Sequence, residues 1–215
     1  MDRYKETFET WNKIAKLYQD KFMHLDLYNE TYEFICASIP KENASILEIG
    51  CGPGNICKYL LNKRPDYRIT GIDIAPDMIA LAKKNNPTAS FEVMDSIEIG
   101  GLDKRYDGVV SGFGLPYLSH EDSNPFLKDC YTLLTDNGFI YLSFVEGDPD
   151  KSGFQVSIRG DRSYFYFYRL EDLIKHFNDI GFIDIKVFKV EYINSAAVKE
   201  IHTILTAKKN ILNNI

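Results

Sequence analysis

Apolar and aromatic residues recur every three or four positions along the N-terminal segment of the chain. The recurring residues are Phe8, Trp11, Ala15, Tyr18, Phe22 and Leu25. At that spacing they fall on one stripe of a helix. The pattern predicts a helical segment that docks its apolar stripe on the rest of the molecule.

From residue 44 onward, short apolar runs alternate with helical patterns. The predicted strands are residues 44–50, 67–73, 89–95, 106–114 and 138–145, and the predicted helices include residues 55–63, 76–86 and one that begins at the capping sequence "SHED", residues 119–122. Neighbouring parallel strands need such crossover helices. We therefore expect an α/β fold, doubly wound and Rossmann-like, with helices on both faces of the sheet.

The C-terminal part of the chain breaks this alternation. A helix over residues 170–181 is followed by two strand patterns, residues 182–192 and 199–209, with no helix between them. Those two strands should pair antiparallel. The prediction is one domain over residues 1–215 with a seven-stranded, mostly parallel sheet and an antiparallel C-terminal strand. Its parts are a helical cap (1–40), a ligand-binding core (44–145), an insertion (146–169) and a C-terminal helix with a strand pair (170–207).

Charge and composition remove several functional classes. The 215 residues carry a formal net charge of -6 with acids and bases interspersed, so no basic surface for nucleic acid is indicated. The four cysteines form no CxxC pair and the four histidines are dispersed, so we expect neither a metal site nor disulfides. The charged start lacks the apolar core of a signal peptide, and no run reaches membrane-spanning length. A cytoplasmic protein without membrane contact is expected.

The stretch "ILEIGCGPGN", residues 46–55, places Gly50, Gly52 and Gly54 between a strand and a helix. A turn of this kind lets a ligand rest on backbone N–H groups at a helix start. The dinucleotide fingerprint G-x-G-x-x-G would require a third glycine at position 55, where this chain has Asn55.

Three acids, Glu48, Asp73 and Asp95, should meet at one rim of the sheet, because each lies at or near the end of a predicted strand. A carboxylate at the end of the second strand can accept the hydroxyl groups of a ribose. Three carboxylates suit a cationic ligand such as a sulfonium nucleoside better than a pyrophosphate.

The segments "ILEIGCGPGN", "ITGIDIAPDMIALAKK", "FEVMDS" and "YDGVVSGFGLPYL" together resemble the class I S-adenosylmethionine-dependent methyltransferases. The resemblance spans roughly residues 10 to 207. It implies an enzyme that transfers a methyl group from S-adenosylmethionine to a small-molecule acceptor. The cofactor-binding residues that it implies are Tyr18, Glu48, Gly50, Cys51, Gly52, Asp73, Ile74, Met78, Asp95, Ser96 and Ser111.

The catalytic residue, the methylated atom, the acceptor and the oligomeric state are not fixed by the sequence. His120 and Tyr117 follow the fourth predicted strand, but His120 sits in the capping sequence and an exposed role is favoured. A methyl donor that is already activated requires no general base unless the acceptor must lose a proton.

Two regions are candidates for an acceptor pocket. The first is the N-terminal stripe with Trp11, Tyr18 and Phe22, which in relatives folds over the cofactor as a lid. The second is the insertion, whose aromatic residues 164–168 alternate sides if extended and whose arginines Arg159, Arg162 and Arg169 are candidate partners for an acceptor carboxylate. Two alternatives stay open: a cofactor-binding sensor or partner subunit without turnover, and a NAD-dependent oxidoreductase.

Overall fold

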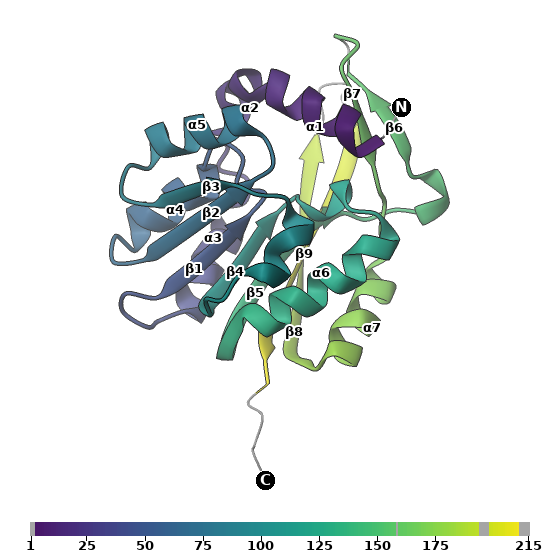
Figure 1. The fold of residues 1–215 in the computed structure, drawn as a ribbon. Coiled ribbons are helices and arrows are strands. Elements are labelled where there is room, and N and C mark those ends of the chain that lie inside the picture. Colours follow the sequence, from purple (N-terminus) through teal and green to yellow (C-terminus); the bar gives the residue numbers. More distant parts are fainter. Residues whose placement is uncertain (1–2, 158, 194–197, 211–215) are drawn as a thin grey trace.

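A seven-stranded sheet forms the centre of the molecule (Figure 1). The computed structural model describes residues 3–157, 159–193 and 198–210. The strands are β1 (Ser45–Ile49), β2 (Arg68–Asp73), β3 (Ser90–Val93), β4 (Tyr106–Gly112), β5 (Leu134–Val145), β8 (Phe182–Ile193) and β9 (Lys199–Lys209), with a separate hairpin of β6 (Gly153–Val156) and β7 (Arg162–Phe165). The helices are α1 (Arg3–Lys13), α2 (Ala15–Phe22), α3 (Asn29–Ser38), α4 (Asn55–Lys63), α5 (Pro76–Asn85), α6 (His120–Leu133) and α7 (Leu170–Ile180).

The strand order in the sheet is β3-β2-β1-β4-β5-β9-β8. The first five strands in this order pair parallel, and β9 pairs antiparallel with both β5 and β8. The predicted fold class and the antiparallel strand pair of the tail are confirmed, and the connection between the two tail strands at residues 194–197 lies outside the described residues. The chain order reverses at β1, which lies between β2 and β4. In such sheets a ligand binds beyond the carboxyl ends of the strands at this reversal.

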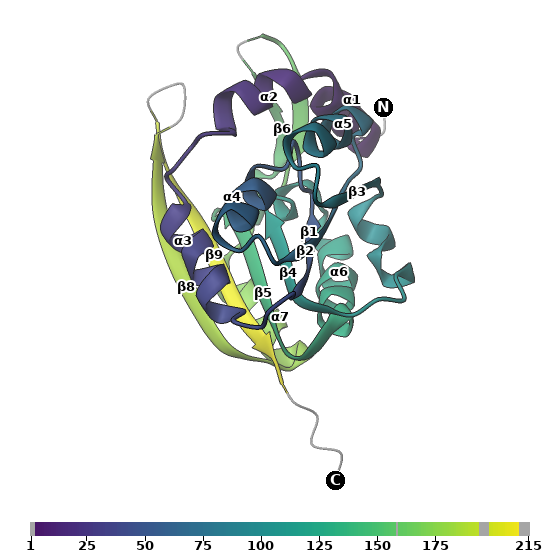
Figure 2. The same cartoon turned by 90° about the vertical axis from the view of Figure 1, so that its left-hand side faces the viewer.

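Helices cover both faces of the sheet, because each buried strand alternates its side chains between two apolar cores. Leu47 and Ile49 of β1 belong to the core under α6 and α7, whereas Ile46 belongs to the core under α3, α4 and α5. Figure 2 shows α3 and α4 on one side of the sheet and α6 on the other. Glu48 alternates with Leu47 and Ile49, so its carboxyl group enters the α3–α4 side.

The N-terminal segment is helical, as its apolar spacing predicts, but it forms three helices. Ile14 leaves helical geometry between α1 and α2. The apolar stripe docks as expected: Ala15 is buried with Ala75 and Met78 around α5, and Phe8 and Trp11 contact the same cluster.

The helix α1 also bonds to the β6–β7 hairpin, which is distant from it in the sequence. Lys13 pairs with Asp161 at 2.7 Å and Arg162 pairs with Glu6 at 3.1 Å. The backbone N–H of Tyr164 donates to the hydroxyl of Thr7 at 2.8 Å. The hairpin and α1 therefore form one layer at the edge of the fold.

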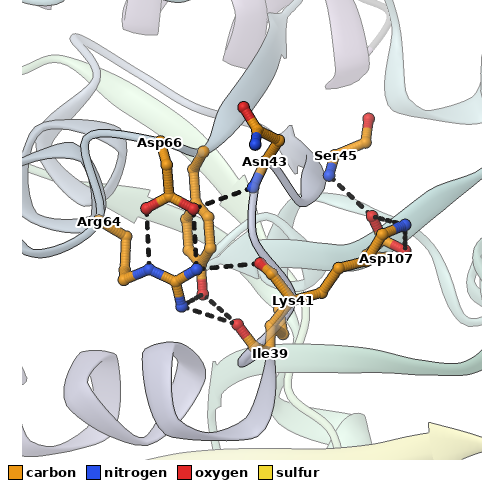
Figure 3. A network of polar contacts seen from close by, with 8 residues as sticks. Ile39, Lys41, Asn43, Ser45, Arg64, Asp66 and Asp107 are labelled. Carbon is orange, nitrogen blue, oxygen red and sulfur yellow. Dashed lines mark hydrogen bonds and ion pairs between the residues drawn. The ribbon is translucent and has the colours of Figure 1, made fainter.

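A polar network fixes the connection from α3 to β1 (Figure 3). The guanidinium of Arg64 donates to the carbonyl oxygens of Ile39 at 3.0 Å and Lys41 at 2.9 Å, and to both carboxylate oxygens of Asp66. This hydrogen bonding to Arg64 lowers the pKa of Asp66 to about 2. Lys41 in turn donates to Asp107 at 2.8 Å. The network holds the chain just before β1 in place. It therefore helps to position the glycine turn at the other end of β1.

Candidate functional site

The glycine turn after β1 uses its three glycines for two purposes. All three have positive φ: 66° at Gly50, 52° at Gly52 and 80° at Gly54. Such angles are readily adopted by glycine and strained for other residues. A Cβ at Gly54 would lie 2.4 Å from the side-chain nitrogen of Asn86, so this glycine permits close packing of α4 on the end of α5. Gly50 and Gly52 instead line a cavity.

Asp73, at the end of β2, reaches across to the glycine turn. One carboxylate oxygen accepts the N–H of Gly52 at 2.9 Å and the other accepts the N–H of Ala75 at 2.9 Å. Burial raises the pKa of Asp73, while these two hydrogen bonds act in the opposite direction. A carboxylate has about four acceptor positions. Each oxygen of Asp73 therefore keeps acceptor capacity for a ligand hydroxyl.

The cavity has a volume of about 250 Å³ and lies at the carboxyl ends of the parallel strands, with α1 and α2 across this end of the sheet (Figure 1). It brings together nine of the eleven residues that the resemblance implied for cofactor binding. They are Tyr18, Gly50, Gly52, Asp73, Ile74, Met78, Asp95, Ser96 and Ser111. Asp95 also begins the 3-10 turn of residues 96–101 by accepting the N–H of Ile97 at 3.1 Å.

Glu48 and Cys51, the other two implied residues, lie outside the cavity wall. Glu48 is 1% exposed, and its Oε2 has no hydrogen-bond partner among the described residues. Burial raises the pKa of Glu48 to about 8, opposed by a hydrogen bond from the backbone of Cys57 and assisted by the Asp73 carboxylate. Burial likewise raises the pKa of Cys51. Neither side chain lines the cavity, and their part in cofactor binding stays a prediction.

Aromatic side chains from α1 and from the segment after β4 close the rest of the cavity. Trp11 contacts Tyr18 and Tyr117 edge-on, with ring centroids 5.5 Å and 5.3 Å apart. Trp11 and Tyr18 of the expected lid do line the cavity, whereas Phe22 does not. The apolar spacing of the N-terminal segment was the signal for these contributions.

Several wall residues were not anticipated as ligand-contacting. They are Tyr4, Thr7, Phe8, Ile49, Met94, Ile97, Gly112, Phe113, Gly114, Leu118 and Phe126. Phe113 has a φ of 57° and follows the last residue of β4, Gly112, at a position that the sequence pattern places inside the strand. No periodic signal marks such a residue.

The insertion does not contribute to the wall, which corrects one of the two expectations for the acceptor pocket. None of the described aromatic residues at 164–168 lines the cavity; Tyr166 and Tyr168 are buried, and Phe165 touches the wall residue Tyr117 with centroids 5.8 Å apart. Arg162 pairs with Glu6, and Arg169 pairs with Asp148 at 2.9 Å. Like these two, Arg159 lies outside the wall.

His120 is also outside the cavity wall. Its Nε2 lies 2.8 Å from the carbonyl oxygen of Phe167, so it donates there. Ser119 caps α6 as predicted by accepting the N–H of Asp122 at 3.1 Å. Tyr117, by contrast, lines the cavity, and burial raises the pKa of its hydroxyl well above its usual range.

In residues 3–157, 159–193 and 198–210, no cluster of three or more His, Cys, Asp or Glu side chains is arranged to hold a metal ion. No helix within the same ranges is long and apolar enough to span a bilayer.

Comparison with known sequences places this cavity in context. Residues 46–138 match a family model described as "Methyltransferase domain". Malonyl-[acyl-carrier protein] O-methyltransferase of Acetivibrio thermocellus is 45% identical over 73 residues, 33% of this chain and 25% of that protein. Trans-aconitate 2-methyltransferase of Streptomyces avermitilis is 34% identical over 147 residues, 64% of this chain and 52% of that protein. The chain spans 43%, 25% and 62% of three of the curated relatives that it matches.

Solved structures share the fold at low sequence identity. The 1,6-didemethyltoxoflavin-N1-methyltransferase of Burkholderia thailandensis, with bound 1,6-didemethyltoxoflavin and S-adenosylhomocysteine, has a TM-score of 0.71 at 18% identity, covering 96% of this chain and 88% of that one. The N-methyltransferase NodS of Bradyrhizobium japonicum WM9, in complex with S-adenosylhomocysteine, has a TM-score of 0.71 at 15% identity, covering 95% and 98%. In sequence, residues 46–138 are therefore similar to a methyltransferase domain, and the whole chain shares its fold with methyltransferases whose structures hold S-adenosylhomocysteine.

Proposed function

We propose that this chain binds S-adenosylmethionine in the cavity and transfers its methyl group to a small-molecule acceptor. The observation that carries the proposal is the Asp73 carboxylate, held by two backbone N–H groups at the mouth of a glycine turn with acceptor positions left over. A ribose offers the two hydroxyl groups that such a carboxylate accepts.

The wall fits the remaining parts of the cofactor. Ile74, 40% exposed, offers an apolar surface for the adenine beside Asp95 and Ser96. Gly50 and Gly52 leave room for the methionine portion, since a Cβ at either position would approach no atom closer than 3.6 Å.

Unused polar atoms in the wall also fit a ligand. Ser111 Oγ and Trp11 Nε1 are buried, and the described residues supply neither with a hydrogen-bond partner. Buried polar groups are normally paired, so an unpaired one at a cavity is expected where a ligand completes the site.

The cofactor, once bound, supplies a methyl group on a positively charged sulfur. The protein must then hold the acceptor nucleophile in line behind that methyl and keep water out. Alignment of two reactants can lower a barrier by about 7–11 kcal/mol. The aromatic contacts of Trp11 with Tyr18 and Tyr117 provide the enclosure.

Ligand-dependent stability tests the proposal. With S-adenosylmethionine or S-adenosylhomocysteine at a hundred times Kd, the native state gains about 2.7 kcal/mol. For a chain of this size that gain raises Tm by roughly 5–10 °C. NAD should give no shift. A shift with NAD alone, or with none of the three ligands, would refute cofactor binding.

The variant Asp73→Asn sharpens the test. An amide offers one acceptor oxygen where the carboxylate offers two. Affinity for S-adenosylhomocysteine should fall at least about tenfold, equivalent to about 1.4 kcal/mol. Asp103→Asn, at an exposed position outside the wall, is the matched control and should bind like the parent chain. Binding without turnover on any acceptor would support a sensor instead of an enzyme.

A further inference from the structure

We propose that the acceptor is a planar, uncharged nitrogen compound, methylated at a neutral ring or aryl-amine nitrogen, and is neither a carboxylate nor an alcohol. This inference rests on the proposed function and names its substrate class. It follows from what the acceptor end of the cavity contains and from what it lacks.

The acceptor end is identified by the order of the strands. Asp73 and Asp95 follow β2 and β3, and Gly50 follows β1, so the cofactor occupies the β3-β2-β1 side. The wall continues past β1 to the end of β4, where Ser111 to Gly114 line it, and is closed there by Tyr117 and by residues of α1. We therefore place the acceptor at this β4–α1 end of the cavity.

This end is lined mainly by aromatic rings, and the unpaired polar atoms there, Ser111 Oγ and Trp11 Nε1, belong to uncharged side chains. The rings belong to Phe8, Trp11, Phe113, Tyr117 and Phe126. Aromatic groups of a ligand gain from offset or edge-on contacts with such rings beyond the area that they bury. The hydroxyl of Thr7 is already used, because it donates to the carbonyl of Arg3 at 2.7 Å and accepts the N–H of Tyr164. A planar, largely apolar acceptor fits this lining.

No cationic side chain lines the cavity within the described residues. Arg162, on the neighbouring hairpin, is paired with Glu6. Arg3 lies over the rings of Tyr164 and Tyr166, at 5.3 Å and 5.4 Å from their centroids. A carboxylate acceptor would enter a site whose own charges are the carboxylates of Asp73 and Asp95. Burying an unpaired charge is costly, so carboxylates are disfavoured.

Apart from Asp73 and Asp95, which lie on the cofactor side, the described wall residues include no carboxylate, histidine or amine that could act as a general base. Burial raises the pKa of Tyr18 to about 12 and that of Tyr117 further, so both hydroxyls stay protonated. The ring nitrogens of His202 face the hydroxyl of Tyr28, at 2.5 Å, and Glu200, and this histidine is not in the wall. An alcohol must lose its proton during attack and would need such a base.

A neutral nitrogen acceptor needs no general base. Its lone pair forms the new N–C bond to the methyl group while the C–S bond breaks, and the bonding pair stays on sulfur, which becomes a neutral thioether. If the nitrogen carried a hydrogen, the resulting cation releases that proton to water after it leaves the site. Every atom and charge is then accounted for without a protein base.

Three probes that share a fused pair of six-membered aromatic rings test the inference: isoquinoline, 2-naphthol and 2-naphthoate. Each is titrated by calorimetry into the protein saturated with S-adenosylhomocysteine at pH 8. Isoquinoline should bind at least tenfold more tightly than 2-naphthoate, and with S-adenosylmethionine it alone should yield S-adenosylhomocysteine at a rate tenfold above background. Equal or tighter binding of 2-naphthoate, methylation of 2-naphthol, or no binding of isoquinoline at millimolar concentration would overturn the inference.

A charge introduced into the wall gives a second, independent test. Phe8→Lys places an ammonium group at a half-buried wall position and should raise affinity for 2-naphthoate at least tenfold. Leu17→Lys adds the same charge at a position 40% exposed and outside the wall, and should leave that affinity unchanged. An equal response of both variants, or of neither, contradicts the inference. Cofactor binding, measured separately, reports whether the proposed function itself holds.

Discussion

Glu48 makes the stability of the fold depend on pH in a direction opposite to that of an ordinary carboxylate. The side chain is 1% exposed, and its pKa is raised from 4.5 to about 8, chiefly by burial. A proton is therefore bound more tightly in the folded state than in the unfolded state. The stabilisation from this proton is fully present below about pH 4.5 and is lost as pH rises through about 8.

The magnitude follows from the two pKa values. Between pH 4.5 and pH 7 the unfolded chain releases this proton and the folded chain keeps it, at about 1.4 kcal/mol for each pH unit. By pH 7 the loss amounts to about 3 kcal/mol, a substantial part of the 5–15 kcal/mol typical of a domain. Glu48→Gln removes the titration while keeping the size of the side chain.

Urea unfolding of both proteins at pH 5, 6, 7 and 8 measures the effect. The amide of the variant changes the free energy of unfolding by the same amount at every pH. The informative quantity is therefore the slope of the difference between the two proteins against pH. The free energy of unfolding of the parent chain should fall relative to Glu48→Gln by about 1.3 kcal/mol for each unit between pH 5 and 7, and by about 1 kcal/mol between pH 7 and 8, where the folded protein begins to release the proton. Glu42→Gln, at an exposed position, controls for the loss of one acidic charge. Parallel profiles for the parent chain and Glu48→Gln would refute the reasoning.

Two further comparisons test the packing of the fold. Gly54→Ala should lower the free energy of unfolding by about 2–4 kcal/mol, because its Cβ would lie 2.4 Å from the side-chain nitrogen of Asn86 and the positive φ would be strained. Gly52→Ala should lower it by about 1–2 kcal/mol, because only the strained φ contributes. Equal losses of unfolding free energy in urea would contradict the separation of the two glycines. Arg64→Ala should lower that free energy by about 1–3 kcal/mol, because the carbonyl of Ile39 and its neighbours lose their donors. Arg64→Lys should recover less than half of the loss, since an ammonium group cannot span the network; full recovery in a thermal melt would show that charge alone matters.

The regular elements near the glycine turn could be predicted closely from the sequence. The helix predicted at residues 55–63 is α4, with the same bounds. Local chemistry decides this boundary, because Gly54 adopts a left-handed conformation that ends the turn. The convergence of Asp73 and Asp95 was likewise predictable, since strand ends in a parallel sheet share one edge.

Features set by tertiary contact were harder to predict. The fifth parallel strand begins at Leu134, ahead of the apolar run that starts at Gly138, and its pairing with β4 shifts register between Tyr106 and Gly108. The insertion carries many aromatic residues, and composition alone cannot say whether they face a ligand or neighbouring protein. In the structure they pack around His120 and α1, and the cavity is lined instead by Phe113 and residues of α1.

Hydrogen bonds and ion pairs join α1, which lines the cavity, to the β6–β7 hairpin, which is distant from it in the sequence. A molecule that enters or leaves past Trp11 must displace α1, and α1 is tied to the hairpin through Thr7 and Lys13. Displacing α1 alone would break these contacts. Substitutions in the hairpin that remove them, at a distance from the cavity, should therefore shorten the time that a bound molecule stays.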